Sequence, residues 1–152
     1  MNAPPVLALT GHRGLPPGAP ALIRRQLEEL VLQYPGSTWL SGGAVGVDQV
    51  AALVLLELGQ RVEFVLPFPL RLQSARWTSV EREALRALTA QAAAVEILRD
   101  GYHVGGYHQR NRRLLERADV LVAFTDGRAT GGTASVIRQA ERKGVPVIRG
   151  RV

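Results

Sequence analysis

Two glycine-rich segments of the chain carry residue types suited to binding an anion. They are SGGAVGVD at residues 41–48 and TDGRATGGT at residues 125–133, and each lies between an apolar run and a helical pattern. Glycine lets backbone amides approach a ligand closely, and the free amides at a helix start carry partial positive charge. The two segments together predict a phosphate-binding pocket, with a plain tight turn as the alternative for the first. Neither contains a dinucleotide-binding fingerprint or a Walker A motif.

Four polar side chains in or near these segments are candidates for contact with the anion. The hydroxyl groups of Ser41 and Thr133 can donate hydrogen bonds, and Thr133 can alternatively cap its own helix. In TGHRG, residues 10–14, Arg13 suits bidentate binding of phosphate or carboxylate, with an ordinary exposed arginine as the alternative. His12 is interpreted as a hydrogen-bonding or stacking residue, and catalysis by its imidazole is the less favoured hypothesis.

A third segment, YHQRNRRLLERAD at residues 107–119, places an amide on an apolar helical face. Asn111 shares that face with leucines, and a buried amide needs hydrogen-bond partners, so Asn111 either ties loops together or faces the ligand. Arg110, Arg112 and Arg113 flank it. We expect at least one of these arginines to lie on a solvated face.

The segment at 67–78, PFPLRLQSARWT, resembles an insertion and is interpreted as a flap over the site. Trp77 within it either stacks on a base or anchors the flap to the core, and Tyr102 and Tyr107 are the other stacking candidates near the loops. The histidines, His12, His103 and His108, have no recognised metal-binding spacing, so no metal site is expected. No Ser–His–Asp order is visible, and no catalytic residue is assigned.

Short apolar runs alternate with helical patterns along the whole chain. Strands are expected at residues 6–11, 37–43, 61–68, 94–98, 119–126 and 145–150. Helices are expected at residues 19–34, from Val45 or Gly46 to Gly59, at 78–92, near 109–118 and at 131–144. This alternation predicts a three-layer α/β fold with a mostly parallel sheet of five to six strands and helices on both faces. In the helix at 78–92, the residues expected in register are Val80, Ala84, Leu88 and Ala92.

Ligands of open α/β sheets bind at the carboxyl ends of the strands. The segments that follow the predicted strands should therefore gather along one rim of the sheet. They are residues 10–14, 41–48, 67–77 and 125–133.

Composition sets the class of protein. A chain of 152 residues with 46% hydrophobic content suits one globular domain over 1–152. No apolar run approaches the ~20 residues that cross a membrane, and the N-terminus lacks the basic region of a signal peptide. There are no cysteines, so a cytoplasmic location is expected. The net charge of +6 indicates either an anionic ligand or nucleic acid, or only a bias toward arginine codons.

The ordered set of TGHRG, SGGAVGVDQVAA, PFP…RW, QRNRRLLERADVLVAFTDG and GGTASVIRQAERKGVPVI resembles the YpsA-like branch of the SLOG superfamily over nearly the whole chain. That superfamily also contains DprA and the LOG phosphoribohydrolases. The resemblance implies a Rossmann-like fold that binds a nucleotide-type ligand at the two glycine loops. No cofactor is assigned, and a nucleotide or an ADP-ribose-type compound is the expected ligand.

The resemblance also implies which residues bind the ligand. From the first half of the chain they are Gly11, His12, Arg13, Ser41, Gly42, Gly43, Gly46 and Asp48; from the second half they are Arg110, Asn111, Gly131, Gly132 and Thr133. Trp77 joins this list from the flap interpretation. Asp48 matches the acidic position of the family's glycine–valine–aspartate motif, and its carboxylate either holds the loop through backbone amides or meets a ribose hydroxyl.

One departure from the LOG pattern bears on activity. LOG enzymes carry a glutamate shortly after the Gly-Thr of their glycine motif, whereas the matching ATGGTASVIRQ here has none before Glu141. The favoured function is therefore a nucleotide-binding sensor or regulatory protein. N-glycosidic hydrolysis and DprA-like binding of single-stranded DNA stay open as alternatives, as does self-association into a homo-oligomer. No membrane contact is expected.

Overall fold

A computed structural model of the chain describes residues 3–152. The expected domain range of 1–152 thus includes residues 1 and 2, which lie outside the described part. The strands are β1 (Val6–Gly11), β2 (Thr38–Ser41), β3 (Arg61–Leu66), β4 (Ala94–Ile97), β5 (Val120–Thr125) and β6 (Val147–Arg151). The helices are α1 (Ala19–Gln33), α2 (Val47–Glu57), α3 (Leu70–Gln73), α4 (Ser79–Gln91), α5 (Gly106–Arg117) and α6 (Gly132–Lys143).

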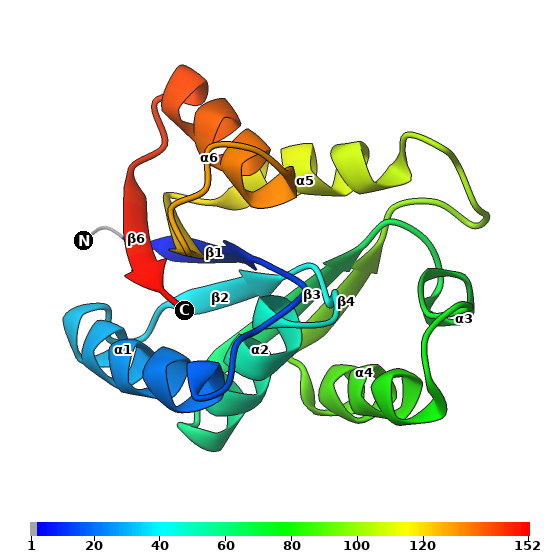
Figure 1. The fold of residues 1–152 in the computed structure, drawn as a ribbon, viewed down its shortest axis with the longest axis horizontal. Helices are drawn as coiled ribbons and strands as arrows, with labels where there is room; N and C mark the ends of the chain where they lie inside the picture. The colour runs from blue at the N-terminus through cyan, green and yellow to red at the C-terminus, as the bar shows by residue number, and fades with distance from the viewer. Residues whose placement is uncertain (1–2) are drawn as a thin grey trace.

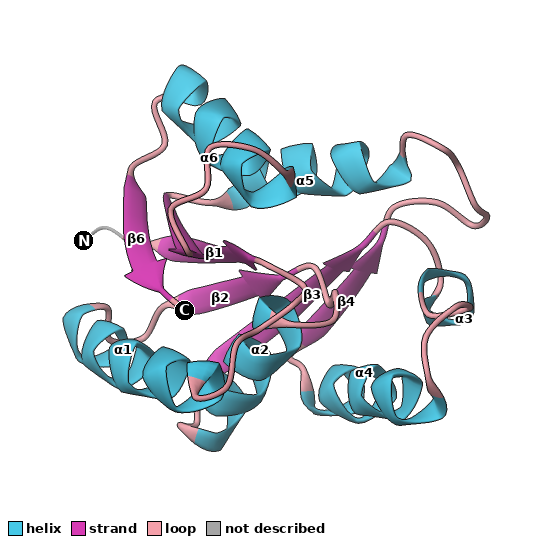
Figure 2. Cartoon of the chain, in the orientation of Figure 1, coloured by secondary structure: helices cyan, strands magenta, loops and turns pink. Residues whose placement is uncertain are grey.

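All strand pairs are parallel, and the sheet order is β4-β3-β2-β1-β5-β6. Helices α1, α2 and α4 cover one face of the sheet, and α5 and α6 cover the other (Figures 1 and 2). The expected three-layer, Rossmann-like α/β fold is confirmed. The chain fills the sheet from β1 to β4 in one direction and then returns to the other side of β1, so the direction of winding reverses between β1 and β5.

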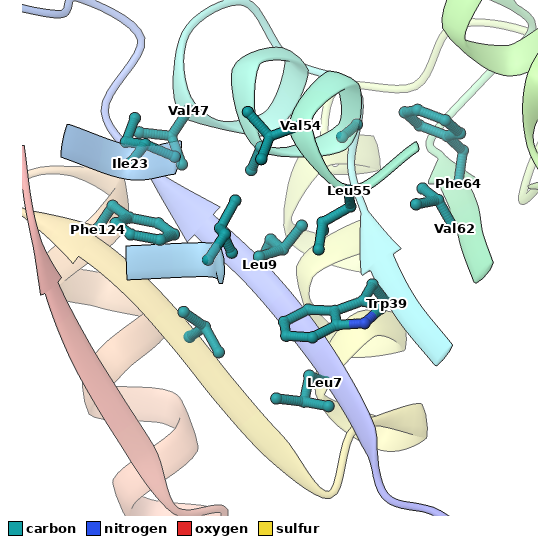
Figure 3. Packing of buried hydrophobic residues seen from close by; sticks show 14 of the residues in the cluster. Leu7, Leu9, Ile23, Trp39, Val47, Val54, Leu55, Val62, Phe64 and Phe124 are labelled. Carbon is teal, nitrogen blue, oxygen red and sulfur yellow. The ribbon is translucent and has the colours of Figure 1, made fainter. Parts of the chain in front are cut away.

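Successive side chains of β1 point to opposite faces of the sheet, so this strand contributes to both hydrophobic cores. Leu7 and Leu9 pack with α1, α2 and α4, whereas Ala8 between them packs with α5 and α6. Figure 3 shows the larger core, in which Leu9 lies near Leu55 and Phe124. Strand side chains that are apolar on both faces are what a parallel sheet buried between two helical layers requires.

The expected register of the helix at 78–92 is wrong in one respect. Leu85 and Leu88 face the core, and Val80 is 78% exposed. Thr78 is the N-cap and forms a capping box with Glu81, which fixes the helix start at Ser79. Val80 therefore lies in the first turn, and a spacing of five residues puts it on a different side of the helix from Leu85.

Two further boundaries differ from expectation. Helix α5 begins at Gly106, three residues before the expected start, because the His103 carbonyl accepts from the Gly106 amide and extends the helix back into the loop. The segment at 67–78 contains the short helix α3, which the sequence pattern missed. This segment is not a flap: Phe68 and Gln73 are buried, and Trp77 packs against the larger core.

Candidate functional site

The main pocket lies at the carboxyl ends of β1 and β5, where the winding of the sheet reverses. Its volume is about 490 Å³. Open α/β folds bind ligands at this position because the loops diverge there and leave a crevice. The predicted site residues that line the pocket are Gly11, His12, Arg13, Asp48, Arg110, Asn111, Gly131, Gly132 and Thr133. The predicted residues that do not line it are Ser41, Gly42, Gly43, Gly46 and Trp77.

The start of α6 opens into this pocket. Gly131 precedes the helix at φ 98°, a conformation that glycine adopts without strain, and the first turn carries no acidic residue. Within residues 3–152, no side chain caps this helix, and the amides of Gly132, Thr133 and Ala134 donate to no acceptor. Free amides at a helix start bind anions because their dipoles point the same way.

The start of α2 is different although its loop looks similar in sequence. The Ala44 amide donates to Asp48 Oδ2 at 3.2 Å, the Gly43 amide donates to Ser41 Oγ at 3.1 Å, and the Val47 amide donates to the His12 carbonyl at 3.1 Å. Groups of the loop itself and of the neighbouring loop after β1 thus satisfy these amides. Of the two roles considered for Asp48, holding the loop through a backbone amide is present in the structure.

The glycines of this loop admit neighbouring chain rather than ligand. A Cβ at Gly42 would overlap the guanidinium of Arg110, and a Cβ at Gly46 would overlap the His12 and Arg13 carbonyls. Gly46 also has a φ of 96°, which a side chain would strain. These contacts explain why both glycines lie behind the pocket wall and not on it.

Two buried charges of opposite sign line the pocket. Asp48 is 8% exposed and Arg110 is 6% exposed. Arg110 Nη1 donates to the Gly42 carbonyl at 2.6 Å, and its Nε donates to Asn111 Oδ1 at 3.0 Å. In the described part of the chain, Asp48 Oδ1 and Arg110 Nη2 have no hydrogen-bond partner, and no ion pair joins the two groups. Each group therefore keeps one atom available to a ligand.

Burial governs the ionisation of this pair. It raises the pKa of the Asp48 carboxyl, and the positive charge of Arg110, the Ala44 amide and the charge of Arg13 oppose that rise. Burial also lowers the pKa of the Arg110 guanidinium, against the attraction of Asp48. Both shifts follow from the cost of holding a charge away from water.

His12 connects three loops at the pocket. The Asp126 amide donates to His12 Nε2 at 3.2 Å, and His12 Nδ1 lies 3.4 Å from Thr133 Oγ1. Thr125 Oγ1 is 3.3 Å from the same Nε2. The His12 side chain is 9% exposed, so it lies mostly within the wall and links the loop after β1 to β5 and α6. This arrangement agrees with the hydrogen-bonding interpretation of His12.

Tyr107 lines the pocket but is missing from the predicted site list. Two guanidinium groups lie over its ring: the distance from Cζ to the ring centroid is 5.8 Å for Arg13 and 5.7 Å for Arg110. Phe68 contacts the same ring edge-on at 5.4 Å. The available signal was the helical spacing that puts Tyr107 on one face with Asn111.

The three arginines around Asn111 have three different environments. Arg110 is buried in the site, and Arg113 pairs with Glu96 at 2.9 Å. Arg112 is exposed and makes no ion pair within the described residues. The expectation that at least one of them lies on an exposed face holds for Arg112.

Two negative findings concern residues 3–152. No helix there has the length and apolar character to cross a membrane. No three or more histidine, cysteine, aspartate or glutamate side chains gather there in a group that could hold a metal ion.

The chain is similar to several known proteins. A UPF0398 protein of Shouchella clausii is 30% identical over 113 residues, which are 70% of this chain and 60% of that protein, so the chain spans less than two thirds of this relative. DNA processing protein A from Helicobacter pylori, described for its single-stranded DNA binding mode, is 22% identical with a TM-score of 0.74, covering 97% of this chain and 65% of its own. A molybdenum cofactor binding protein from Rippkaea orientalis is 20% identical with a TM-score of 0.67, and the match covers 98% of this chain and 77% of that protein's chain.

The two solved structures show the shared fold, because their identity to this chain is low. The comparison with protein families shows the family as well as the fold. A family model described as the YspA SLOG family, YpsA, matches residues 20–145, which include most of the pocket-lining segments. The chain therefore belongs to the YpsA SLOG family.

Proposed function

We propose that the pocket binds a nucleotide or a phosphorylated nucleotide derivative, and that the protein acts as a sensor or regulatory protein in the cytoplasm. One observation carries the proposal: the uncapped start of α6 opens into the same pocket as the buried Arg110 and Asp48. A helix start and a guanidinium favour phosphate, and a carboxylate accepts hydrogen bonds from sugar hydroxyls. The pocket volume of about 490 Å³ is typical of pockets that bind small molecules such as a nucleotide.

Different residues of the pocket bind different parts of the ligand. The free amides of Gly132 and Thr133, together with the Thr133 hydroxyl and Arg13, receive the phosphate. Asp48 Oδ1 accepts from a ribose hydroxyl. Arg128 also lines the pocket, but its Nε donates to Asp126 at 3.0 Å, so it is already paired.

A binding role is favoured over N-glycosidic hydrolysis. Glu141, the first glutamate after Thr133, does not line the pocket, and its Oε1 accepts from Arg149 at 2.8 Å. Asp48 is the one acid among the described residues that line the pocket. Asp48 is held by the Ala44 amide, and no glutamate among the described residues lines the pocket, so hydrolysis by the LOG route lacks its acid.

The comparisons support ligand binding in a general way. The Helicobacter pylori protein binds single-stranded DNA, and the Rippkaea orientalis protein binds the molybdenum cofactor. Both proteins share the fold of this chain. The net charge of +6 on this chain suits an anionic ligand. Binding of single-stranded nucleic acid is the second candidate, favoured by the first of these similarities.

A thermal-shift panel of nucleoside monophosphates, cyclic nucleotides and ADP-ribose compounds tests the proposal. A ligand at ~100 times its Kd stabilises the folded state by about 2.7 kcal/mol, which raises Tm by roughly 5–10 °C for a chain of this size. Arg13→Ala should weaken binding by about tenfold. Arg25→Ala, which removes an exposed arginine from α1, should leave it unchanged. The proposal fails if no compound shifts Tm, or if Arg13→Ala binds the ligand with the same affinity as Arg25→Ala.

A further inference from the structure

A second hollow, of about 350 Å³, lies beside the candidate pocket between α5 and α6. His108 and Arg112 of α5 line one side, and Gln139, Arg142 and Lys143 of α6 line the other. His108 also lines the candidate pocket, so the two hollows adjoin at this residue. We call the second hollow the α5–α6 groove.

The cations of the α5–α6 groove lack acidic partners. In residues 3–152, no ion pair involves Arg112, Arg142 or Lys143. The acids nearest to them in sequence are engaged elsewhere: Glu116 contacts Arg113 at 3.4 Å, and Glu141 contacts Arg149 at 2.8 Å. Three cations with no compensating acid repel one another, and an anion relieves this repulsion.

The composition of the groove indicates the kind of group that it binds. Its lining holds three cations, a histidine and an amide, with no acid and no tyrosine, phenylalanine or tryptophan. Arginine and lysine donate to phosphate oxygens, and the Gln139 amide supplies a further donor. Among the described residues of this lining, His108 supplies the one aromatic ring, at the junction with the candidate pocket. The three cations and the Gln139 amide therefore favour a phosphate group over a base.

We propose that the α5–α6 groove is a second phosphate subsite, and that the ligand is a small nucleotide carrying two separated phosphate groups. This inference rests on the proposed function of the main pocket. One phosphate lies at the start of α6, the nucleoside fills the pocket, and the second phosphate passes His108 to reach Arg112 and Arg142.

A small ligand is favoured over a long nucleic-acid strand. Sequence-independent binding of a single strand combines a basic path with aromatic rings that stack successive bases. The aromatic rings near the site, Tyr107 and Tyr102, both contact Phe68 on the side of the loop before α5, whereas the cations lie between α5 and α6. The cationic path beyond the pocket thus accommodates one phosphate, and among its described lining residues it has no series of aromatic rings for successive bases.

Calorimetry with matched ligands tests this inference. The probes are the 5′-monophosphates and the 3′,5′-bisphosphates of adenosine, guanosine, cytidine and uridine. The bisphosphate of the preferred base should bind at least about tenfold tighter than its monophosphate. The double variant Arg112→Gln/Arg142→Gln should lose this gain and keep monophosphate affinity. Arg25→Gln/Arg76→Gln, which removes the same charge from exposed positions outside both hollows, should keep the gain.

The outcomes separate the two proposals. Monophosphate binding without any gain from the second phosphate overturns the subsite and leaves the main pocket intact. A gain that persists in Arg112→Gln/Arg142→Gln also overturns it, because the second phosphate then lies elsewhere. Affinity that keeps rising along a series of longer single-stranded oligonucleotides indicates a nucleic-acid strand and overturns the small-ligand class. Failure of every probe to bind removes both proposals.

Discussion

Single residues at the site owe their positions to backbone contacts. Asp48 is held by the Ala44 amide, and Arg110 is held by the Gly42 carbonyl. Neither charge neutralises the other directly, which leaves each partly available at the pocket wall. Such a pair costs folding free energy because burial removes water from both groups.

Gly42→Ala tests the packing of the Arg110 guanidinium. A Cβ at residue 42 overlaps Nη1 and Cζ of Arg110, so the guanidinium must leave the Gly42 carbonyl. We expect the free energy of unfolding to fall by about 1–3 kcal/mol in urea denaturation. Gly101→Ala, with open space around the new Cβ, should change it by less than about 0.5 kcal/mol. Equal stability of the two variants would contradict the observed packing.

Asp48→Asn tests the ionisation of the buried carboxyl. A raised pKa means that the folded state binds the proton more tightly than the unfolded state, so stability falls as pH rises above the ordinary value of 3.8 toward the folded value. The variant does not ionise and loses this pH dependence. Its stability relative to wild type should therefore increase from acid to neutral pH, as followed by urea denaturation across that range.

The matched control for that series is Glu28→Gln, which removes an exposed acid from α1. It reports the effect of deleting one surface charge. A difference between Asp48→Asn and wild type that stays constant with pH would show that the carboxyl has the same pKa in both states.

The helices that follow the two glycine loops explain why only one of the loops has free amides. Helix α2 carries Asp48 in its first turn, and the loop before it bonds its own amides. Helix α6 has no acid in its first turn and no side-chain cap among the described residues. Since a helix start attracts one negative group, α2 already has its own and α6 is left for a ligand.

Gly132→Asp separates stability from binding at the start of α6. A carboxylate there interacts favourably with the helix dipole, so the free protein should gain about 0.3–1 kcal/mol in the free energy of unfolding. The same carboxylate repels phosphate, so the Tm shift from a nucleotide ligand should shrink strongly. Thermal denaturation with and without ligand measures both effects. A variant that keeps the full ligand shift would place the phosphate away from α6.

At the scale of the molecule, β1 is the element on which the site and both cores depend. It pairs with β2 and β5, contributes to the cores on both faces, and ends at the pocket. Strand β4 differs: among the described strands it pairs with β3 alone, and Val95 and Ile97 are 37% and 45% exposed.

Hydrogen exchange should follow this contrast. Amides of Leu7, Ala8 and Leu9 should exchange only through global unfolding, whereas those of β4 should exchange through local opening at lower free energy. Native-state exchange followed by mass spectrometry or NMR measures both. Similar protection of β1 and β4 would show that the edge strand opens only with the whole domain.

Sequence periodicity predicted the six strands and the layers because each strand and helix carries its pattern locally. It did not find α3, where a buried Gln73 donates to the Gly42 carbonyl 31 residues away in sequence. Nor did it show that the Val47 amide is taken by the His12 carbonyl. Such long-range contacts decide which predicted residues line the pocket, and a local pattern contains no information about them.

The strand order also has a consequence for synthesis on the ribosome. The first four strands emerge before β5, so β1 is then an edge strand whose free amides and carbonyls are open to pairing with another chain. Only the arrival of β5 closes that edge, and α6 follows it to complete the pocket. A nascent chain halted after β4 should therefore depend on chaperones, and the pocket is complete only once the last third has been translated.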